Sequence, residues 1–301
     1  MIEIQVIQDL KEAEALWRAL SPQRVIFDDW DFRYGFYKYE PYPLYFIAAY
    51  EAVDNKKEPV GLMPLQVSSD WGGKEMFAEE PCEENRVFVK SGYETLIKKL
   101  YESLHGQGKV KIYDISGEDE FTTGLKIEDY KYVLPLKGLN SFADFLKNRL
   151  SPKRRHSLEK ELAAVEALEP EIILNNLSDL DTLFTLNINN FAEESYLPKE
   201  KEAWRELVAS AKFDWRLTSL RHQGETIAAS LAVLYQGNWH YLITGTSFKT
   251  YPGVGKYLNK VNIELAIKAG ADYFDAGLGD CGWKLLWHFD KIAQYEFIQL
   301  K

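Results

Sequence analysis

The sequence predicts an α/β protein of two domains, each combining helices with a mixed, mostly antiparallel sheet. Three observations support this fold class. The chain has 301 residues, which favours two domains or one large one. Segments with strand-like and helix-like hydrophobic patterns follow one another along its length. Apolar residues make up 46% of the sequence and aromatic residues 14%, which is enough for a folded core.

The first predicted domain covers residues 1–130. Its expected elements are the strand Glu3–Ile7, the helix Leu10–Leu20, an aromatic-rich stretch at 27–39, the hairpin strands Leu44–Tyr50 and Val60–Val67, the helix Tyr93–Leu104 and the strand Val110–Ile115. This part holds all the excess acid of the chain, with 15 Lys+Arg against 25 Asp+Glu, whereas residues 131–301 carry 21 of each. A field of that sign disfavours a nucleic-acid partner.

The second predicted domain covers residues 131–301. Its expected elements are the strand Tyr132–Leu136, a helix from Ser141, a helix capped by Ser151 with Pro152 at its first position, the strand Glu171–Leu174, the helices Leu177–Phe191 and Lys199–Ala211, the antiparallel strands Trp215–Leu220, Thr226–Tyr235 and Trp239–Gly245, the helix Lys256–Ala269, and the strands Tyr273–Asp275 and Tyr295–Leu300. Both domains show a weak pattern of a helix, a hairpin and a second helix. One interpretation is that the two domains arose by duplication.

The stretch Tyr251-Pro-Gly-Val-Gly-Lys-Tyr-Leu258 joins a strand-like segment to a helix-like one. A glycine-bearing turn before a helix leaves backbone N–H groups pointing outward at the positive end of the helix dipole, where a phosphate binds. Only small residues let a phosphate approach the backbone that closely. The alternative is a plain strand-to-helix turn, in which Pro252 and Gly253 only provide the backbone conformation that the turn requires.

These motifs, taken in order, resemble the FemAB/CelD-like branch of the GNAT acyltransferases. The similarity rests on the basic helix start within Leu136–Arg155, Gly224–Ala228 at a hairpin turn, Pro252–Gly255, Ala269-Gly270, Asp275-Ala-Gly and Lys284, and in the first part on Phe27–Trp30 and Val60–Leu65. The resemblance implies two tandem GNAT-like domains, the first degenerate. It also implies an acyl-CoA donor whose pyrophosphate lies on the glycine loop. The residues expected to hold the donor are Thr244, Thr246, Gly253, Val254, Gly255, Lys256 and Tyr257.

The best catalytic candidates are Asp275, Lys284 and His240. Acyl transfer needs a deprotonated amine and a polarised carbonyl. Asp275 would orient or deprotonate the amine, Lys284 would stabilise negative charge, and backbone N–H groups near Thr244–Thr246 would polarise the carbonyl. The alternative is that Asp275 and Asp280 cap turns, that Lys284 pairs with one of them, and that His240 is structural.

The expected substrate-binding residues are Trp30, Tyr34, Arg154, Arg155, Tyr241 and Trp283. Trp30 and Tyr34 line an acceptor cleft in one reading and belong to the core in the other. Basic residues in the first turn of a helix oppose its dipole, and an anion bound at Arg154 and Arg155 would relieve that mismatch. The alternative is a solvated face with pairs such as Arg155–Glu159.

The expected function is acyl transfer from acyl-CoA to a small-molecule or peptide amine, without a metal. Two rivals remain: a Fem-type transfer from aminoacyl-tRNA to a cell-wall peptide precursor, and a GNAT scaffold that binds a ligand without turnover. The acidic first domain weighs against tRNA. Two cysteines without a pairing pattern, no signal-peptide pattern and no apolar run of roughly 20 residues favour a cytoplasmic protein. The oligomeric state does not follow from the sequence.

Overall fold

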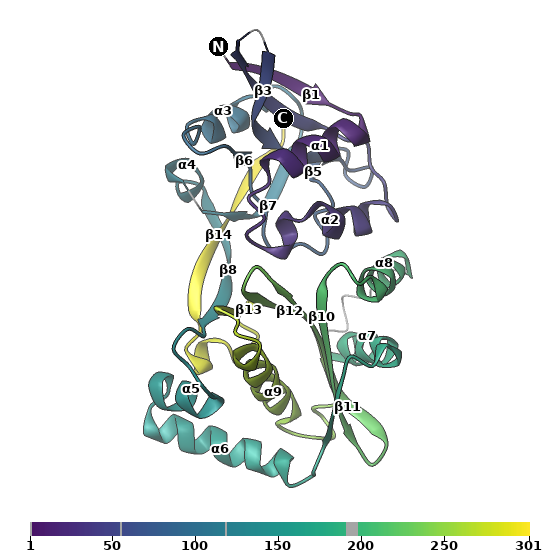
Figure 1. Ribbon diagram of the computed structural model, residues 1–301, viewed down its shortest axis with the longest axis vertical. Coiled ribbons are helices and arrows are strands. Elements are labelled where there is room, and N and C mark those ends of the chain that lie inside the picture. Colours follow the sequence, from purple (N-terminus) through teal and green to yellow (C-terminus); the bar gives the residue numbers. More distant parts are fainter. Residues whose placement is uncertain (1, 55, 118, 191–197) are drawn as a thin grey trace. The chain divides into compact units, whose positions relative to one another are not determined.

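The computed structural model describes residues 2–54, 56–117, 119–190 and 198–301 (Figure 1). It divides into two compact units, unit 1 with residues 1–130 and 293–301 and unit 2 with residues 131–292. The chain enters unit 2 within strand β8 (Lys126–Pro135) and leaves it within β14 (Asp290–Gln299). Our assignment of residues 293–301 to the second domain was wrong, because Gln294 to Gln299 pair with β7 (Val110–Ser116) of unit 1.

Unit 1 alternates strands and helices in the order β1 (Ile2–Ile7), α1 (Leu10–Leu20), η1 (Ile26–Asp28), α2 (Trp30–Tyr37), β2 (Phe46–Val53), β3 (Lys56–Met63), β4 (Leu65–Val67), β5 (Lys74–Met76), β6 (Phe88–Val89), α3 (Leu96–Glu102), β7, α4 (Glu120–Thr123). One sheet has the order β1-β2-β3-β6, with α1 and α3 on opposite faces (Figure 1). The predicted strand Val60–Val67 is divided between β3 and β4, which lie in different sheets. The division falls at Pro64, which has no N–H to continue a ladder.

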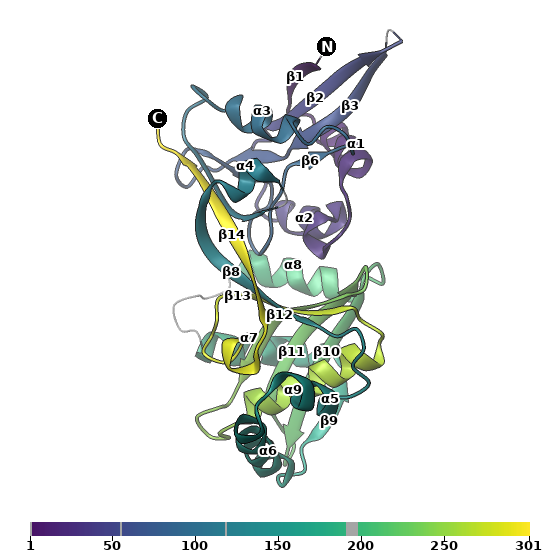
Figure 2. The ribbon, with the colours of Figure 1, turned by 90° about the vertical axis from the view of Figure 1, so that its left-hand side faces the viewer.

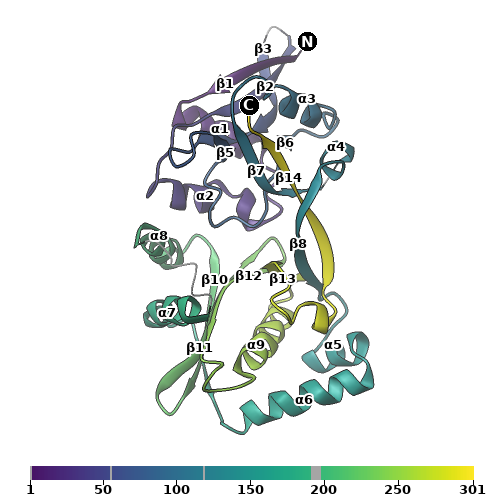
Figure 3. The same cartoon turned by 180° about the vertical axis from the view of Figure 1, so that it is seen from behind.

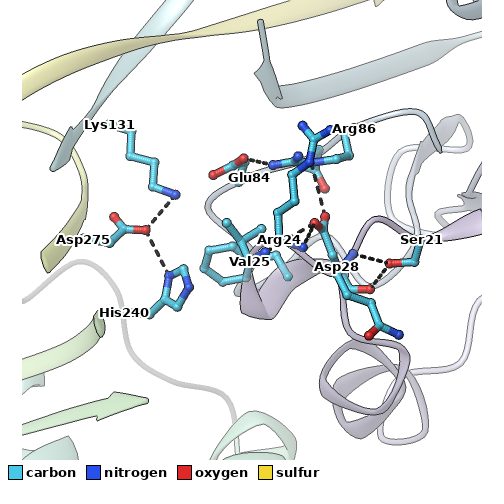
Figure 4. A network of polar contacts seen from close by, with 12 residues as sticks. Ser21, Arg24, Val25, Asp28, Glu84, Arg86, Lys131, His240 and Asp275 are labelled. Atoms are coloured by element: carbon cyan, nitrogen blue, oxygen red, sulfur yellow. Dashed lines mark hydrogen bonds and ion pairs between the residues drawn. The ribbon is translucent and has the colours of Figure 1, made fainter. Parts of the chain in front are cut away.

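The interior of unit 1 combines aromatic rings with a buried polar network. Trp17 packs edge-to-face on Trp30, with ring centroids 5.8 Å apart. The Arg33 guanidinium is 2% exposed and donates to the carbonyl oxygens of Phe27, Phe77 and Glu84. Asp28 accepts the backbone N–H of Arg24 at 3.0 Å and pairs with Arg86, which also pairs with Glu84 (Figure 4). These contacts hold the segments around residues 28 and 84 together.

Unit 2 contains α5 (Phe142–Arg149), α6 (Pro152–Glu166), β9 (Glu171–Leu174), η2 (Leu177–Asp179), α7 (Leu180–Asn190), α8 (Pro198–Ala209), β10 (Asp214–His222), β11 (Glu225–Tyr235), β12 (Asn238–Thr246), α9 (Val254–Lys268), β13 (Tyr273–Leu278) and η3 (Leu285–Trp287). Its strands have the order β8-β13-β12-β11-β10-β9. In the three views of the ribbon, α7 and α8 cover one face of this sheet and α9 covers the other (Figures 1, 2 and 3).

Local sequence explains where the helices of unit 2 begin. Ser151 caps α6 by accepting the backbone N–H of Arg154, and Pro152 is its first residue, as predicted. Gly253 precedes α9 with φ of 88°, a left-handed conformation that glycine adopts without strain. The predicted helix 177–191 begins as the 3-10 turn η2 and continues as α7. Its predicted last residue, Phe191, lies outside the described residues.

The two units share an order of elements along the chain. In unit 1 a strand, two helices and a hairpin (β1, α1, α2, β2, β3) precede α3 and β7. In unit 2 a strand, two helices and three antiparallel strands (β9, α7, α8, β10, β11, β12) precede α9 and β13. The pair α5–α6 precedes this pattern in unit 2.

Candidate active site

Strands β12 and β13 run parallel for only three residue pairs and then part. The last pair joins His240 to Asp275, although β12 continues to Thr246 and β13 to Leu278. A bulge in β12 follows directly, since Tyr241 and Ile243 face Ala232 and Leu231 on the neighbouring strand. Bulges bend a strand and re-aim its side chains, and they are frequent beside functional sites. The parting therefore places His240 and Asp275 where the sheet opens.

Asp275 lies between two basic side chains. Its Oδ2 is 2.7 Å from the Lys131 Nζ and 3.0 Å from the His240 Nδ1 (Figure 4). Its Oδ1 accepts the backbone N–H of Gly277 at 3.0 Å. The exposed fractions of Lys131, His240 and Asp275 are 3%, 1% and 4%, so this ionic cluster is removed from water.

The charge of Asp275 is fixed by its neighbours. Burial alone would raise the pKa of this carboxyl, because a charge is costly away from water. The Lys131 ammonium and the hydrogen bond from His240 outweigh burial and hold the pKa of Asp275 far below its usual range. Asp275 is therefore a carboxylate, and it orients the imidazole by accepting from Nδ1. A buried polar cluster of this kind is costly to build, and such clusters are common at functional sites.

Lys284 fastens the chain just beyond the parting. Its Nζ donates to the carbonyl oxygens of Gly277 at 3.2 Å and Leu278 at 2.6 Å, and it lies 5.4 Å from the centre of the Tyr132 ring. The expected alternative, in which Asp275 and Asp280 cap turns, is confirmed for both carboxylates: Asp275 accepts the backbone N–H of Gly277, and Asp280 accepts that of Leu285. Lys284 thus brings a buried ammonium to the end of β13 and holds that end in place.

The edge of β12 beyond the parting is met by α7. Gly245 lets the two backbones come close, since a Cβ on it would lie 2.5 Å from the Asn187 backbone nitrogen. The Asn190 side chain accepts the Thr246 N–H at 2.8 Å and donates to the Thr246 carbonyl at 2.7 Å. Asn187 donates to the Thr244 carbonyl at 2.7 Å. Asn190 therefore occupies the Thr246 N–H, one of the backbone groups near Thr244–Thr246 that were expected to polarise the donor carbonyl.

The turn before α9 has the form that the sequence predicted. Gly253 is its cap residue without a side-chain capping bond, and the first turn of α9 holds no acidic residue. The Gly255 position is open, because a Cβ there would make an ordinary contact of 3.5 Å with the Thr246 side chain. Val254 is fully buried and Tyr257 is 7% exposed, so these two side chains anchor the turn to the core. What the turn offers to a ligand is its backbone.

Helix α6 lies against this turn. A Cβ on Gly253 would lie 3.4 Å from Val165 and 3.6 Å from the Glu161 carbonyl oxygen. The Lys256 ammonium pairs with the Glu161 carboxylate, and Lys260 pairs with Glu166 one turn further along. Lys256 was expected to add charge for a cofactor phosphate. In this structure that charge is already matched by Glu161.

The expected substrate-binding aromatic residues fall into different settings. Trp30 is 3% exposed and stacks on Phe77 in the core of unit 1. Tyr34, which is partly exposed, stacks on Trp30. Tyr241 is buried and donates to the Asn259 side chain at 3.0 Å. Trp283 is half-buried, edge-to-face with Trp287. Trp30 and Tyr241 are thus parts of the core, and Tyr34 and Trp283 reach solvent.

The basic start of α6 is partly exposed. Arg154 and Arg155 are half-buried, Lys153 is exposed, and the first turn contains no acidic residue. The preceding helix α5 ends with Lys147 and Arg149, and Arg149 pairs with Asp290 at 3.1 Å. The α5–α6 corner therefore carries a run of cations.

The corresponding turn of unit 1 is filled by its own side chain. Gly92, before α3, has the same φ of 88° as Gly253. Its N–H donates to the Glu94 carboxylate at 2.9 Å, and backbone hydrogen bonds lower the pKa of Glu94. A carboxylate thus occupies the position that an external anion would take.

Comparison with known families identifies the fold. Residues 152–285 match the model of the acetyltransferase (GNAT) domain. This segment is similar to GNAT domains. The match begins with α6 and extends past β13 to residue 285, so it includes the parting strands, the glycine turn, His240, Asp275 and Lys284. Comparison with curated proteins gave no match.

Several solved structures are similar in fold to nearly the whole chain. FemX is 11% identical, with 99% of this chain and 97% of that chain covered and a TM-score of 0.63. L-PGS from Bacillus licheniformis is 12% identical, with 98% and 93% covered and a TM-score of 0.56. A tandem GNAT protein from the clavulanic acid biosynthesis pathway is 10% identical, with 99% and 98% covered and a TM-score of 0.52. These likenesses concern the fold alone.

Three residues of the site were not predicted from the sequence. Lys131 stands between Tyr130 and Tyr132 in β8 and is buried, and a buried lysine is a signal of a paired charge. Asn187 and Asn190 are three residues apart on α7, so they share a helix face.

No helix among the described ranges is long and apolar enough to span a membrane.

Proposed function

We propose that the chain is an N-acyltransferase that moves an acyl group from an acyl-CoA thioester to a small-molecule or peptide amine. The observation that carries the proposal is the parting of β12 and β13 directly after His240 and Asp275, with the glycine turn of α9 at the far end of β12. A GNAT domain with this opening supports acyl transfer in general. The choice of donor and acceptor belongs to the proposal.

His240 is the proposed base. Asp275 holds Nδ1, so proton exchange with the substrate falls to Nε2 on the other side of the ring. The amine nitrogen attacks the thioester carbonyl and its proton passes to His240. The tetrahedral intermediate then expels the thiolate, which receives a proton. The new C–N bond replaces the C–S bond, and no electrons leave the substrates.

The donor is proposed to lie along β12 toward the α9 turn. The backbone N–H groups at Gly255 and Lys256 begin a helix without an acidic residue in its first turn, which suits a pyrophosphate. Thr244 is the proposed carbonyl-polarising position of the strand. Lys284, held at the end of β13, supplies positive charge near the developing oxyanion. Two free cysteines fit a reducing cytoplasm as the place of the reaction.

A specific observation favours a second candidate, transfer from aminoacyl-tRNA. Glu161 pairs with Lys256, and Asn190 accepts the Thr246 N–H. Two groups that were expected to contact CoA are therefore engaged by other side chains of this chain. The cations at the α5–α6 corner, Lys147 and Lys153 to Arg155, offer an alternative surface for phosphates. The acidic first part of the chain weighs against this candidate.

The test is thermal unfolding with CoA, acetyl-CoA, long-chain acyl-CoAs and a charged tRNA, for the natural chain and for Gly255→Glu. Stabilisation by a CoA species that is lost in the variant supports the proposal, because the glutamate places negative charge at the turn. Stabilisation only by tRNA, weakening steeply with salt, would move the assignment to the second candidate. Stabilisation without product from any donor would indicate a binding scaffold.

A further inference from the structure

Lys131 has no place in the mechanism above, yet it shares one oxygen of Asp275 with His240. The Lys131 Nζ is 2.7 Å and the His240 Nδ1 is 3.0 Å from the same Oδ2. We propose that Lys131 is a positioning residue that sets the pH at which the His240–Asp275 pair takes up a proton. This inference rests on the proposed function, in which His240 is the base.

The position of Lys131 follows from the register of β8 against β13. Asp275 is paired with Val133 of β8, and Lys131 lies two residues before Val133. Side chains two residues apart on a strand share a face of the sheet, so Lys131 is a diagonal neighbour of Asp275. Its ammonium reaches the Asp275 carboxylate from that position.

The charges of the cluster define what Lys131 does. With Lys131 protonated and Asp275 ionised, the buried cluster is neutral when the imidazole is neutral. Adding a proton to His240 would give it a net positive charge away from water, which is unfavourable. An Asp–His pair without the lysine becomes neutral by taking up that proton. Lys131 therefore opposes the uptake of that proton by the pair.

The other ionisable groups on the elements packed against β12 are engaged elsewhere. Lys256 pairs with Glu161, and Asp181 pairs with Arg205. Lys260 pairs with Glu166 and lies over the Tyr257 ring, and Lys284 donates to carbonyl oxygens of β13. Glu264 and Lys268 line a hollow beside the start of α5. On the side of β11, the residue opposite His240 is Val233. Asp275 contacts the imidazole, and Lys131 contacts the same oxygen of Asp275.

The experiment compares the natural chain with Lys131→Met by NMR of ring-labelled histidine, with the His240 signal assigned through His240→Gln. Lys137→Met, an exposed lysine of the same segment, is the matched control. We expect the protonation midpoint of the pair to rise by about 1 unit or more in Lys131→Met and to stay unchanged in Lys137→Met. The acid limb of kcat/KM should move up by the same amount.

An unchanged midpoint in Lys131→Met would overturn the inference. If Lys131→Met does not fold, Lys131→Gln replaces it, with the same two readings, and Lys131→Arg should restore the natural midpoint because it keeps the charge. The NMR midpoint does not depend on turnover. A shifted midpoint in a chain that transfers no acyl group would therefore count against the proposed function, whereas turnover with an unshifted midpoint would count against the inference alone.

Discussion

The His240 Nδ1 lies 3.0 Å from the Asp275 Oδ2 at the last residue pair that β12 and β13 share. Beyond this pair the two strands separate, and each carries a different part of the proposed machinery. β12 leads to the glycine turn of α9, and β13 leads to the loop fastened by Lys284. The imidazole–carboxylate pair thus lies at the point from which the proposed donor-binding and charge-stabilising segments extend.

Replacing Asp275 by asparagine should affect both stability and turnover. The amide would leave the buried Lys131 ammonium without its carboxylate, and breaking a buried pair in this way costs about 3–5 kcal/mol. Turnover should fall by roughly 100-fold or more, because the imidazole loses its orienting partner. Urea unfolding and steady-state rates measure the two effects, with Asp272→Asn, an exposed neighbour, as the control. If Asp275→Asn and Asp272→Asn had the same free energy of unfolding and the same turnover, the proposed roles of Asp275 in stability and catalysis would be contradicted.

Acid should weaken the fold through the same carboxyl group. The pKa of Asp275 is held below its value in the unfolded chain, about 3.9. Its contribution to the free energy of unfolding is therefore complete above that value and is lost as the pH falls toward the folded-state pKa. Urea midpoints measured from pH 6 down to pH 2 should decline more steeply for the natural chain than for Asp275→Asn. Parallel curves would show that the carboxylate is not stabilised by folding.

Freeing Lys256 should strengthen donor binding. In Glu161→Gln the ammonium loses its partly exposed partner and becomes available to a donor phosphate. Partly exposed pairs contribute at most about 1 kcal/mol, so the donor KM should fall by no more than about fivefold. Glu159→Gln, on an exposed part of the same helix, is the control. A donor KM that rises in Glu161→Gln would mean that the ion pair itself shapes the donor site.

Two glycines near the site should respond to alanine in opposite ways. Gly245→Ala would place a Cβ 2.5 Å from the Asn187 backbone nitrogen, and such overpacking costs about 1–3 kcal/mol. Gly255→Ala makes only an ordinary contact and lies in a helix, where alanine is preferred by about 0.5–1 kcal/mol. The Tm should therefore fall in the first variant and hold or rise in the second. Weaker donor binding confined to Gly255→Ala would agree with close approach of a phosphate.

Much of unit 2 follows from local sequence. Ser151 and Pro152 mark the start of α6, and the glycine turn lies between β12 and α9, because caps and tight turns are decided by a few neighbouring residues. His240 and Asp275 were selected individually from their positions in strands. Their direct contact could not be predicted from spacing, since it depends on the parallel register of two strands 35 residues apart.

The remaining features depend on tertiary contacts that no local pattern encodes. Lys131 reaches Asp275 because β8 neighbours β13, with Val133 opposite Asp275 and Lys131 two residues away on the same face. Lys256 meets Glu161 because α6 packs on α9, 95 residues away in the chain. The C-terminal strand returns to unit 1 because it pairs with β7, although its sequence is that of an ordinary strand. Each of these contacts joins residues that are far apart in the sequence, so it follows from strand pairing and helix packing and not from local sequence.

The most direct test of the account is the rate of thiol release from acetyl-CoA in the presence of a panel of primary amines, for the natural chain and for His240→Gln. Donor affinity is measured in parallel by thermal shift. The account predicts amine-dependent thiol release that falls by roughly 100-fold or more in His240→Gln, with donor affinity unchanged. Equal rates in the two proteins, with an equally bound donor, would contradict the role of His240 at the parting of β12 and β13.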